Sequence, residues 1–360
     1  MKKTRTKRRG LFWQILCALL SVVALVCFLG VAAIGRLLPP QQAAKRWQGQ
    51  GDTAYGQVTC LLPVDEKIAL NDIYKFRYAI LDQLRADGFE ADTDTRLFRD
   101  AWSTGGKLRV SSALGHGDVS VTAVGGHFFD FHPLRLYCGS YISEDDLMKD
   151  QVLLDEETAW LLFGSTELQG MQMEIEGQPF VVAGVIQREQ DFASKRAYTA
   201  GRGIYMSYDA YVRLTEEDGA DCYELLLAEP VKDHTVSFVR EKFPIGQGEI
   251  VDNAKRFDFW SLLQTAGKFG SRSMQTHGVI YPYWENAARS LEDWSALLLL
   301  AGLICALPPL VTLIVWIVRL LVRGKEKLAG DLLPRWRDDI EESVRKRQRK
   351  AWVKRHPGED

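Results

Sequence analysis

Two long apolar runs stand out from the pattern of hydrophobic and polar residues along this 360-residue chain. One extends from Leu11 to Gly35 and the other from Trp294 to Val318, and neither contains a charged residue. A helix needs about 20 apolar residues to cross the hydrocarbon core of a bilayer, and the core helices of soluble proteins rarely sustain such a run. We therefore predict two transmembrane helices with a large polar segment between them.

Between the two runs, short stretches of helical and strand periodicity follow one another. Ile73, Phe76, Ile80 and Leu84 share one face of a predicted helix that ends before Gly88. Further helices are expected at residues 156–163, 208–214 and 231–243. Strands are predicted at residues 57–62, 108–114, 119–124, 152–154, 171–175, 180–186, 204–206 and 222–228, with hairpin turns at 115–118 and 176–179. Strands and helices interleave without a strict βαβ order, which favours an α+β domain with two lobes.

The pattern divides the chain into seven segments. They are a basic N-terminus at 1–10, transmembrane helix 1 at 11–35, a linker at 36–56, a core domain at 57–256, a stalk at 257–293, transmembrane helix 2 at 294–318 and a basic tail at 319–360. The stalk begins where an apolar helical face, starting near Phe259, leads towards the second run.

The charges predict on which side of the membrane each segment lies. The net charge of −2 conceals six basic residues and no acidic one in residues 1–10. Residues 36–293 carry 26 basic and 39 acidic residues, a net charge of −13, and residues 319–360 carry 13 and 8, a net charge of +5. Short flanks rich in Lys and Arg stay in the cytoplasm. We therefore expect a two-pass protein with both termini cytoplasmic and residues 36–293 extracytoplasmic.

A cleaved signal peptide is the alternative explanation of the first run. A basic start precedes an apolar stretch that ends in Val31-Ala32-Ala33. The apolar region of a signal peptide usually has about 7–15 residues, and this run is longer. An uncleaved anchor is favoured.

The cysteines give little support to a disulfide framework. Only Cys60, Cys138 and Cys222 lie outside the apolar runs, and an odd number cannot all pair within the chain. Cys60 and Cys222 fall in two predicted strands, which would bring them within bonding distance if the strands were neighbours. Buried free thiols are the alternative, and the sequence leaves both open.

No sequence motif for catalysis, a cofactor or a metal emerges. The chain lacks a phosphate-binding Gly-x-x-x-x-Gly-Lys-Ser/Thr loop, a Gly-x-Ser-x-Gly elbow and a His-Glu-x-x-His pair. His127, Asp130 and His132 are close enough for a metal site, but they alternate with phenylalanines in what is better explained as a packed turn. Acidic residues at 145–146 and 155–157 precede predicted helices and are explained as caps. The chain is therefore not expected to be an enzyme, and any ATP hydrolysis belongs to another chain.

Several unusual segments occur in a recognisable order between residues 119 and 214. They are residues 121–129 (VTAVGGHFF), 139–143 (GSYIS), 152–164 (VLLDEETAWLLFG), 170–175 (GMQMEI) and 180–186 (FVVAGVI). The ordered set resembles the MacB-like periplasmic core domain of ABC-transporter permeases of the MacB/FtsX-like family. The resemblance implies an extracytoplasmic domain with one mixed α/β lobe and one mostly β lobe, held between two transmembrane helices that transmit ATP-driven motion.

The resemblance is to a permease truncated after its second membrane helix, because such permeases have further membrane helices and a cytoplasmic loop that contacts the ATPase. It implies a non-catalytic, membrane-anchored subunit of an ABC-type export or envelope machine in the bacterial cytoplasmic membrane. The expected partners are the lipid bilayer, separate ABC ATPase and permease subunits, and a second copy of the chain; neither a cofactor nor nucleic acid is expected. The alternative is a stand-alone receptor or sensor with an acidic ligand-binding outer domain and a basic signalling tail.

One segment just before the second apolar run is a candidate mechanical junction between stalk and domain. Its residues are Tyr281, Pro282, Tyr283, Trp284, Glu285, Asn286 and Arg289. The structural alternative is an aromatic belt at the membrane surface combined with the N-cap of the stalk helix. If the segment is a junction, replacing Tyr283 and Trp284 by alanine is expected to uncouple the domain without unfolding it.

Overall fold

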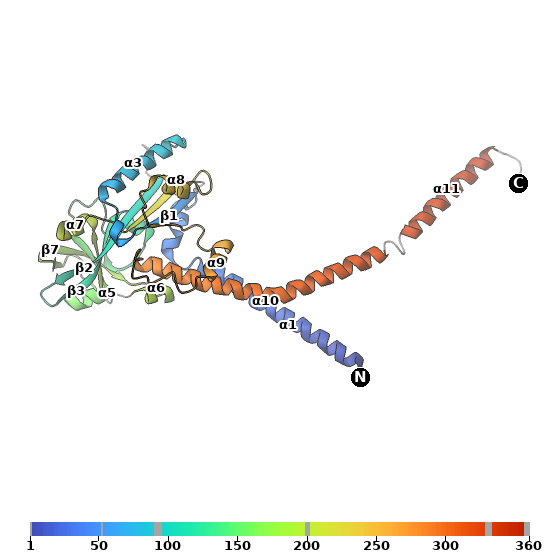
Figure 1. Ribbon diagram of the computed structural model, residues 1–360, viewed down its shortest axis with the longest axis horizontal. Helices are drawn as coiled ribbons and strands as arrows, with labels where there is room; N and C mark the ends of the chain where they lie inside the picture. The colour runs from blue at the N-terminus through green and yellow to red at the C-terminus, as the bar shows by residue number, and fades with distance from the viewer. Residues whose placement is uncertain (1, 52, 90–95, 199–201, 328–332, 356–360) are drawn as a thin grey trace. The chain divides into compact units, whose positions relative to one another are not determined.

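The computed structural model describes residues 2–51, 53–89, 96–198, 202–327 and 333–355 (Figure 1). The chain divides into two compact units, residues 28–300 and residues 1–27 together with 301–360.

The unit of residues 28–300 contains a ten-stranded sheet with the order β10-β1-β9-β2-β3-β8-β5-β7-β4, and β6 pairs with both β2 and β7. The strands are β1 (Tyr55–Leu61), β2 (Phe98–Ser111), β3 (His116–Gly126), β4 (Arg135–Gly139), β5 (Gln151–Asp155), β6 (Gln172–Ile175), β7 (Gln178–Gln187), β8 (Gly203–Ser207), β9 (Cys222–Ala228) and β10 (Glu249–Asp252).

Strand β2 belongs to two parts of this sheet. Its first half, from Phe98 to Ser103, pairs with β9, and its last residues, Val110 and Ser111, pair with β6. The strands β2, β3, β8, β5, β7 and β6 therefore follow one another in a closed ring. The ring forms a mostly β lobe, and β1, β9 and β10 form a mixed lobe with the helices that cover them. The predicted α+β fold with two lobes is confirmed.

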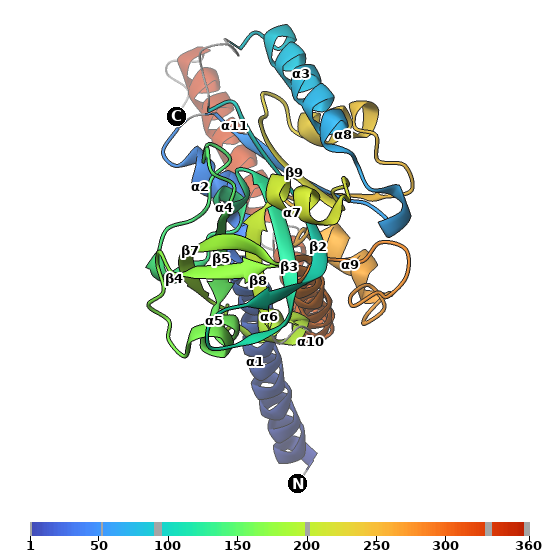
Figure 2. The same ribbon diagram turned by 90° about the vertical axis from the view of Figure 1, so that its left-hand side faces the viewer.

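Helices cover both faces of the sheet (Figure 2). The larger core contains side chains of α3 (Leu70–Ala86), α5 (Glu156–Phe163), α7 (Tyr208–Thr215) and α8 (His234–Lys242). A second core contains side chains of α2 (Ala43–Gln48), α4 (Phe128–Phe131) and the start of α10 (Tyr283–Lys327). Ile73, Phe76, Ile80 and Leu84 are all buried in the larger core, because their spacing places them on one face of α3. The same unit also contains η1 (Pro39–Gln42), η2 (Val64–Glu66), α6 (Phe192–Ala197) and α9 (Phe259–Ala266).

Local sequence signals account for several element ends. Glu176 and Gly177 both have positive φ, 48° and 76°, and join β6 to β7 in a two-residue turn whose twist suits a hairpin. The carboxylate of Asp155 accepts a hydrogen bond of 2.7 Å from the backbone N–H of Thr158 and so caps α5. Gly164 ends the same helix in the left-handed conformation.

Cys60 and Cys222, for which the sequence left a disulfide and buried free thiols open, are both free thiols in the structure. Their strands β1 and β9 are neighbours, but Leu61 lies opposite Cys222 and Cys60 lies opposite Tyr223. Successive side chains of a strand point to opposite faces, so Cys60 lies in the larger core and Cys222 in the second core. Burial raises the pKa of the Cys60 thiol. Both cysteines are therefore buried free thiols, which is the alternative to a disulfide.

Two helices are long and apolar enough to cross a membrane, over Leu11–Ile34 in α1 (Lys2–Ile34) and Tyr283–Lys325 in α10. Most side chains in their apolar windows are exposed, as expected for surfaces that face lipid. In the unit that contains residues 1–27 and 301–360, the indole N–H of Trp13 donates a hydrogen bond of 3.1 Å to Thr312 Oγ1. Helix α10 continues through Pro308 and Pro309. The tail carries α11 (Leu333–Arg355).

Candidate functional site

The junction segment, residues 281–289, contains the start of α10. Pro282 immediately precedes the helix, and its carbonyl accepts hydrogen bonds from the backbone N–H groups of Glu285 and Asn286. Proline is tolerated at this position because an N–H here would have no partner within the helix. Trp284, Glu285, Asn286 and Arg289 are all buried, so the helix begins inside the domain and not at its surface.

Tyr283 connects α10 to the segment that follows β7. Its ring stacks on Tyr198, with centroids 4.2 Å apart and an interplanar angle of 21°. Its hydroxyl donates to Glu189 Oε1 at 3.1 Å and accepts from Tyr205 on β8, also at 3.1 Å. Tyr198 donates a second hydrogen bond to the Glu189 carboxylate. One side of the helix is thus held by stacking and by hydroxyl–carboxylate bonds.

Trp284 packs into the second core with only 5% of its surface exposed. Its ring meets Phe128 of α4 edge-on at 5.5 Å and lies 4.6 Å from the imidazole of His132. His132 Nε2 is 2.5 Å from the carboxylate of Glu224 on β9. Trp284 is therefore linked to β9 through its contact with His132, because His132 forms a buried pair with Glu224.

Two of the three residues considered as a metal cluster, His132 and Asp130, have separate side-chain contacts in the fold. His132 stacks on Phe128 and bonds to Glu224, as described above. Asp130 lies 3.7 Å from Arg99 Nε and so faces a cation. Among the residues that the structure describes, no group of three or more His, Cys, Asp and Glu side chains has an arrangement that holds a metal ion.

On another side of α10, three arginines and three glutamates alternate in one connected series of ion pairs, here called the ion chain. In order, its members are Arg272, Glu292, Arg256, Glu285, Arg289 and Glu249. Three members come from α10, one from β10, one from the turn after β10 and one from the segment after α9. The series joins β10 and the turn after it to the segment after α9 and to α10.

The central members of the ion chain are the most deeply buried. Arg256 bonds to Glu285 and, at 2.8 Å, to Glu292, and the side chains of all three are at most 4% exposed. Glu285 also accepts from Arg289 Nε at 2.7 Å, one helical turn further along α10. Arg289 reaches Glu249 on β10 at 2.8 Å. Removing one partner would leave a buried charge without compensation, so the arrangement is costly to break.

The electrostatics agree with this geometry. Burial alone would lower the pKa of Arg256, but the carboxylates of Glu285 and Glu292 more than compensate and the pKa is raised. Desolvation would raise the pKa of Glu249, and Arg289 more than reverses this, so that the pKa lies below its usual value. Burial raises the pKa of Tyr281 to about 12. All three groups keep their ordinary charge at neutral pH.

Two further side chains of α10 hold the loop that leads into the helix. Asn286 Oδ1 accepts from the backbone N–H of Met274 at 2.7 Å, and its amide group donates to the carbonyl of Tyr281 at 2.9 Å. Asp293 Oδ2 accepts from the backbone N–H of Gly270 at 2.8 Å. The first three turns of α10 are therefore attached by stacking, ion pairs and backbone contacts on different sides.

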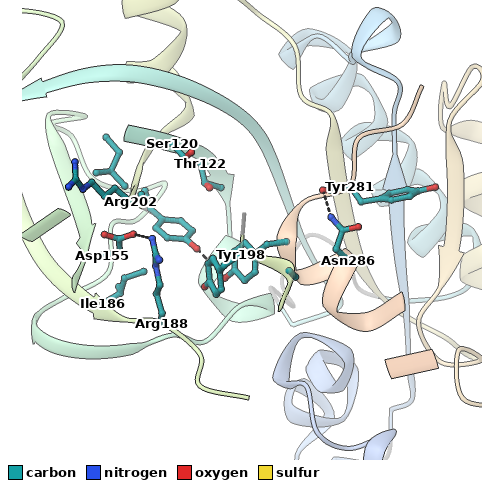
Figure 3. Close-up of a pocket in the computed structure, with 14 residues that line it drawn as sticks. Ser120, Thr122, Asp155, Ile186, Arg188, Tyr198, Arg202, Tyr281 and Asn286 are labelled. Carbon is teal, nitrogen blue, oxygen red and sulfur yellow. Dashed lines mark hydrogen bonds and ion pairs between the residues drawn. The ribbon is translucent and has the colours of Figure 1, made fainter. Parts of the chain in front are cut away.

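A small pocket of about 130 Å³ lies beside the junction segment (Figure 3). Arg188 pairs with Asp155 there, and its guanidinium lies 5.0 Å from the centre of the Tyr198 ring. Tyr281 and Asn286 contribute to the lining from the junction side. Pockets that bury a small organic ligand usually have about 300–1,000 Å³, so this one is too small for such a ligand.

All seven residues of the candidate junction lie together around the start of α10. Most of the residues around them could not be predicted from the sequence, namely Glu189, Tyr198, Tyr205, Glu249, Arg256 and Arg272. One signal was available within α10, because Glu285, Arg289 and Glu292 are spaced by four and three residues and share a helix face. The other partners are distant in sequence and carry no local signal.

A family described as "MacB-like periplasmic core domain" matches residues 21–237 of the chain. The match extends from within α1 to within α8, so the junction segment lies outside it. No curated protein matches the sequence.

Three solved structures are among those to which the chain is similar. The periplasmic region of MacB from Actinobacillus actinomycetemcomitans has 15% identity and a TM-score of 0.38, over 55% of this chain and 89% of that one. The extracellular domain of the noncanonic ABC-type transporter YknZ from Gram-positive bacteria has 16% identity and a TM-score of 0.36, over 52% and 92%. A domain of a putative permease protein from Porphyromonas gingivalis has 10% identity and a TM-score of 0.32, over 54% and 88%.

Proposed function

This chain belongs to the family of proteins with a MacB-like periplasmic core domain, and from that premise we propose that it couples an ATP-driven machine to a substrate or partner across the membrane. Family membership supports a membrane subunit of the ABC type. We propose further that the subunit is non-catalytic and that separate ATPase and permease subunits supply the energy and the transport path. Export or envelope maintenance is the class of process that this arrangement serves.

The observation that carries the proposal is the attachment of α10 to the domain. Helix α10 is continuous from Tyr283 to Lys327, so its buried start and its apolar run belong to one helix. At the buried end, Tyr283, Trp284 and the ion chain bind it to both lobes of the sheet. A displacement of this helix along or about its axis is therefore passed to the strands, because packed interiors transmit strain.

The charges support the membrane topology that this mechanism needs. We propose that both termini are cytoplasmic and that residues 36–293 are extracytoplasmic, since the basic flanks at 1–10 and 319–360 contrast with a net charge of −13 between the apolar runs. In that arrangement the ATPase acts on the cytoplasmic side and the domain acts on the opposite side. A second copy of the chain is a further proposed partner.

Recovery of the chain from its native membrane tests the proposal. A C-terminally tagged chain, purified in mild detergent, is expected to bring down a partner with ATPase activity. The same preparation from cells with an untagged chain gives the background. ATP hydrolysis no higher than that background, in several mild detergents, would refute the ABC-subunit assignment.

A further inference from the structure

Helix α9 presents aromatic side chains to the outside of the domain. Leu262 is buried beneath the helix, whereas Phe259 and Trp260 at its start are exposed, and Trp260 has 71% of its surface free. The two rings lie 5.1 Å apart. An indole left this exposed on a folded domain is unusual, because burying it against a partner or lipid is favourable.

These aromatics are connected to the second apolar run. Phe269, just after α9, is also exposed and contacts Trp294 edge-on at 6.0 Å. Trp294 is the first residue of the apolar run that we expect to cross the bilayer. Figures 1 and 2 both show α9 beside the first turns of α10. Phe259, Trp260, Phe269 and Trp294 are here called the interfacial patch.

The position of the patch determines what covers it. Tryptophan and other aromatics concentrate at the boundary between the headgroups and the acyl chains, and Trp294 must lie close to that boundary if the helix enters the bilayer there. Lys268, exposed beside Phe269, adds a cation at the same level. An apolar aromatic face with an adjacent basic residue is typical of helices that lie in the membrane surface.

We propose that the interfacial patch is inserted into the bilayer surface on the side of the domain, so that α9 is a third membrane contact in addition to the two apolar helices. This contact fixes the tilt of the domain over the lipid. It also restrains the segment from Arg256 to Arg272, whose two ends are members of the ion chain. The bilayer thus acts on the same series of ion pairs that holds α10.

Quenching of tryptophan fluorescence by brominated lipid tests the proposal on the full-length chain. The wild type, Trp260→Phe and Trp160→Phe are each reconstituted into phosphatidylcholine vesicles with and without bromine on the acyl chains. Trp160 is the matched control, since it is 56% exposed on α5, which both views place far from α9. Phenylalanine keeps an aromatic ring at each position, and circular dichroism checks that the fold is retained.

Removing a lipid-facing emitter lowers the fraction of the emission that bromine quenches, whereas removing a water-facing emitter raises it. We expect a lower quenched fraction for Trp260→Phe and a higher one for Trp160→Phe. If Trp260→Phe leaves the fraction unchanged or raises it, water or another protein covers the patch and the proposal is wrong. The result does not depend on whether an ATPase partner exists, so it is separate from the test of the proposed function.

Discussion

Glu285 is the residue on which the attachment of α10 depends most directly. Its buried carboxylate bonds to both Arg256 and Arg289. Changing Glu285 to Gln removes the charge and leaves two buried guanidinium groups with one carboxylate fewer. Breaking a buried ion pair in this way costs about 3–5 kcal/mol, so we expect a markedly lower midpoint of thermal unfolding in mild detergent.

Glu167→Gln is the matched control for this substitution, because Glu167 is exposed on the same domain. It is expected to change the free energy of unfolding by no more than about 0.5 kcal/mol. Equal unfolding midpoints for the two variants would show that the ion chain does not stabilise the fold.

Glu249, at the other end of the ion chain, gives a prediction about pH. Its pKa in the folded protein is lowered by Arg289, so its stabilising effect is present above the ordinary glutamate pKa of about 4.3 and is lost as the pH falls through the lower folded value. We expect Glu249→Gln to destabilise the protein at pH 7 by only about 0.5–1 kcal/mol, because the side chain is partly exposed and solvent screens it.

The pH series distinguishes the charge of Glu249 from its packing. The unfolding midpoints of Glu249→Gln and the wild type are expected to converge as the pH falls below the lowered pKa that Glu249 has in the folded protein. A difference that stays constant between neutral and acid pH would mean that the charge of Glu249 contributes nothing.

At the residue scale, the sequence could predict the candidate junction but only part of its contacts. Tyr283 and Trp284 were identifiable as aromatics next to an apolar run, and Glu285 and Arg289 are one turn apart on the same helix. Arg256 and Arg272 carry no comparable signal, since their pairing arises only when α9 and the turn after β10 pack against α10. The sequence left open whether Cys60 and Cys222 are bonded, because strand register, unlike strand identity, is not predictable from it.

At the scale of elements, helix α3 and the hairpin of β6 and β7 were predictable because their apolar spacing and turn residues agree. The first half of β2 was not, since polar Asp100, Ser103 and Thr104 are buried in it and break the strand pattern. Asp100 is satisfied by Arg77 at 2.8 and 2.9 Å. Strand prediction from the sequence relies on alternating hydrophobic residues. It therefore misses a buried strand whose polar side chains are paired with other polar groups in the fold.

The mechanical role that we propose for α10 predicts the effect of breaking its continuity. Two glycines inserted between Asp293 and Trp294 leave the ion chain in place but introduce two of the poorest helix-forming residues, each about 1 kcal/mol less favourable than alanine. We expect the domain to keep its unfolding midpoint. The ATPase activity of the co-purified complex is expected to be the same with and without this subunit.

The same two glycines inserted between Leu147 and Met148 serve as the control, because both residues are exposed in a loop far from α10 in sequence. This variant is expected to behave as the wild type. Undiminished coupling in the α10 insertion variant would exclude a rigid helix as the means of transmission.

At the scale of the whole molecule, two apolar helices flank a folded domain, and the basic flanks indicate which side the domain faces. This distribution of charge was fully visible in the sequence, because it depends on counts and not on contacts. The proposed coupling requires the domain and the two termini to lie on opposite sides of the membrane. Leu147 on the domain, 98% exposed, and Trp336 on α11, also exposed, are suitable reporters of the two sides.

The most direct test is labelling of intact bacterial cells with a membrane-impermeant maleimide, using Leu147→Cys, Trp336→Cys and the wild-type chain as the blank. We predict that Leu147→Cys reacts in intact cells and that Trp336→Cys reacts only after the cells are permeabilised. Reaction of Trp336→Cys in intact cells, with Leu147→Cys protected until permeabilisation, would contradict the account.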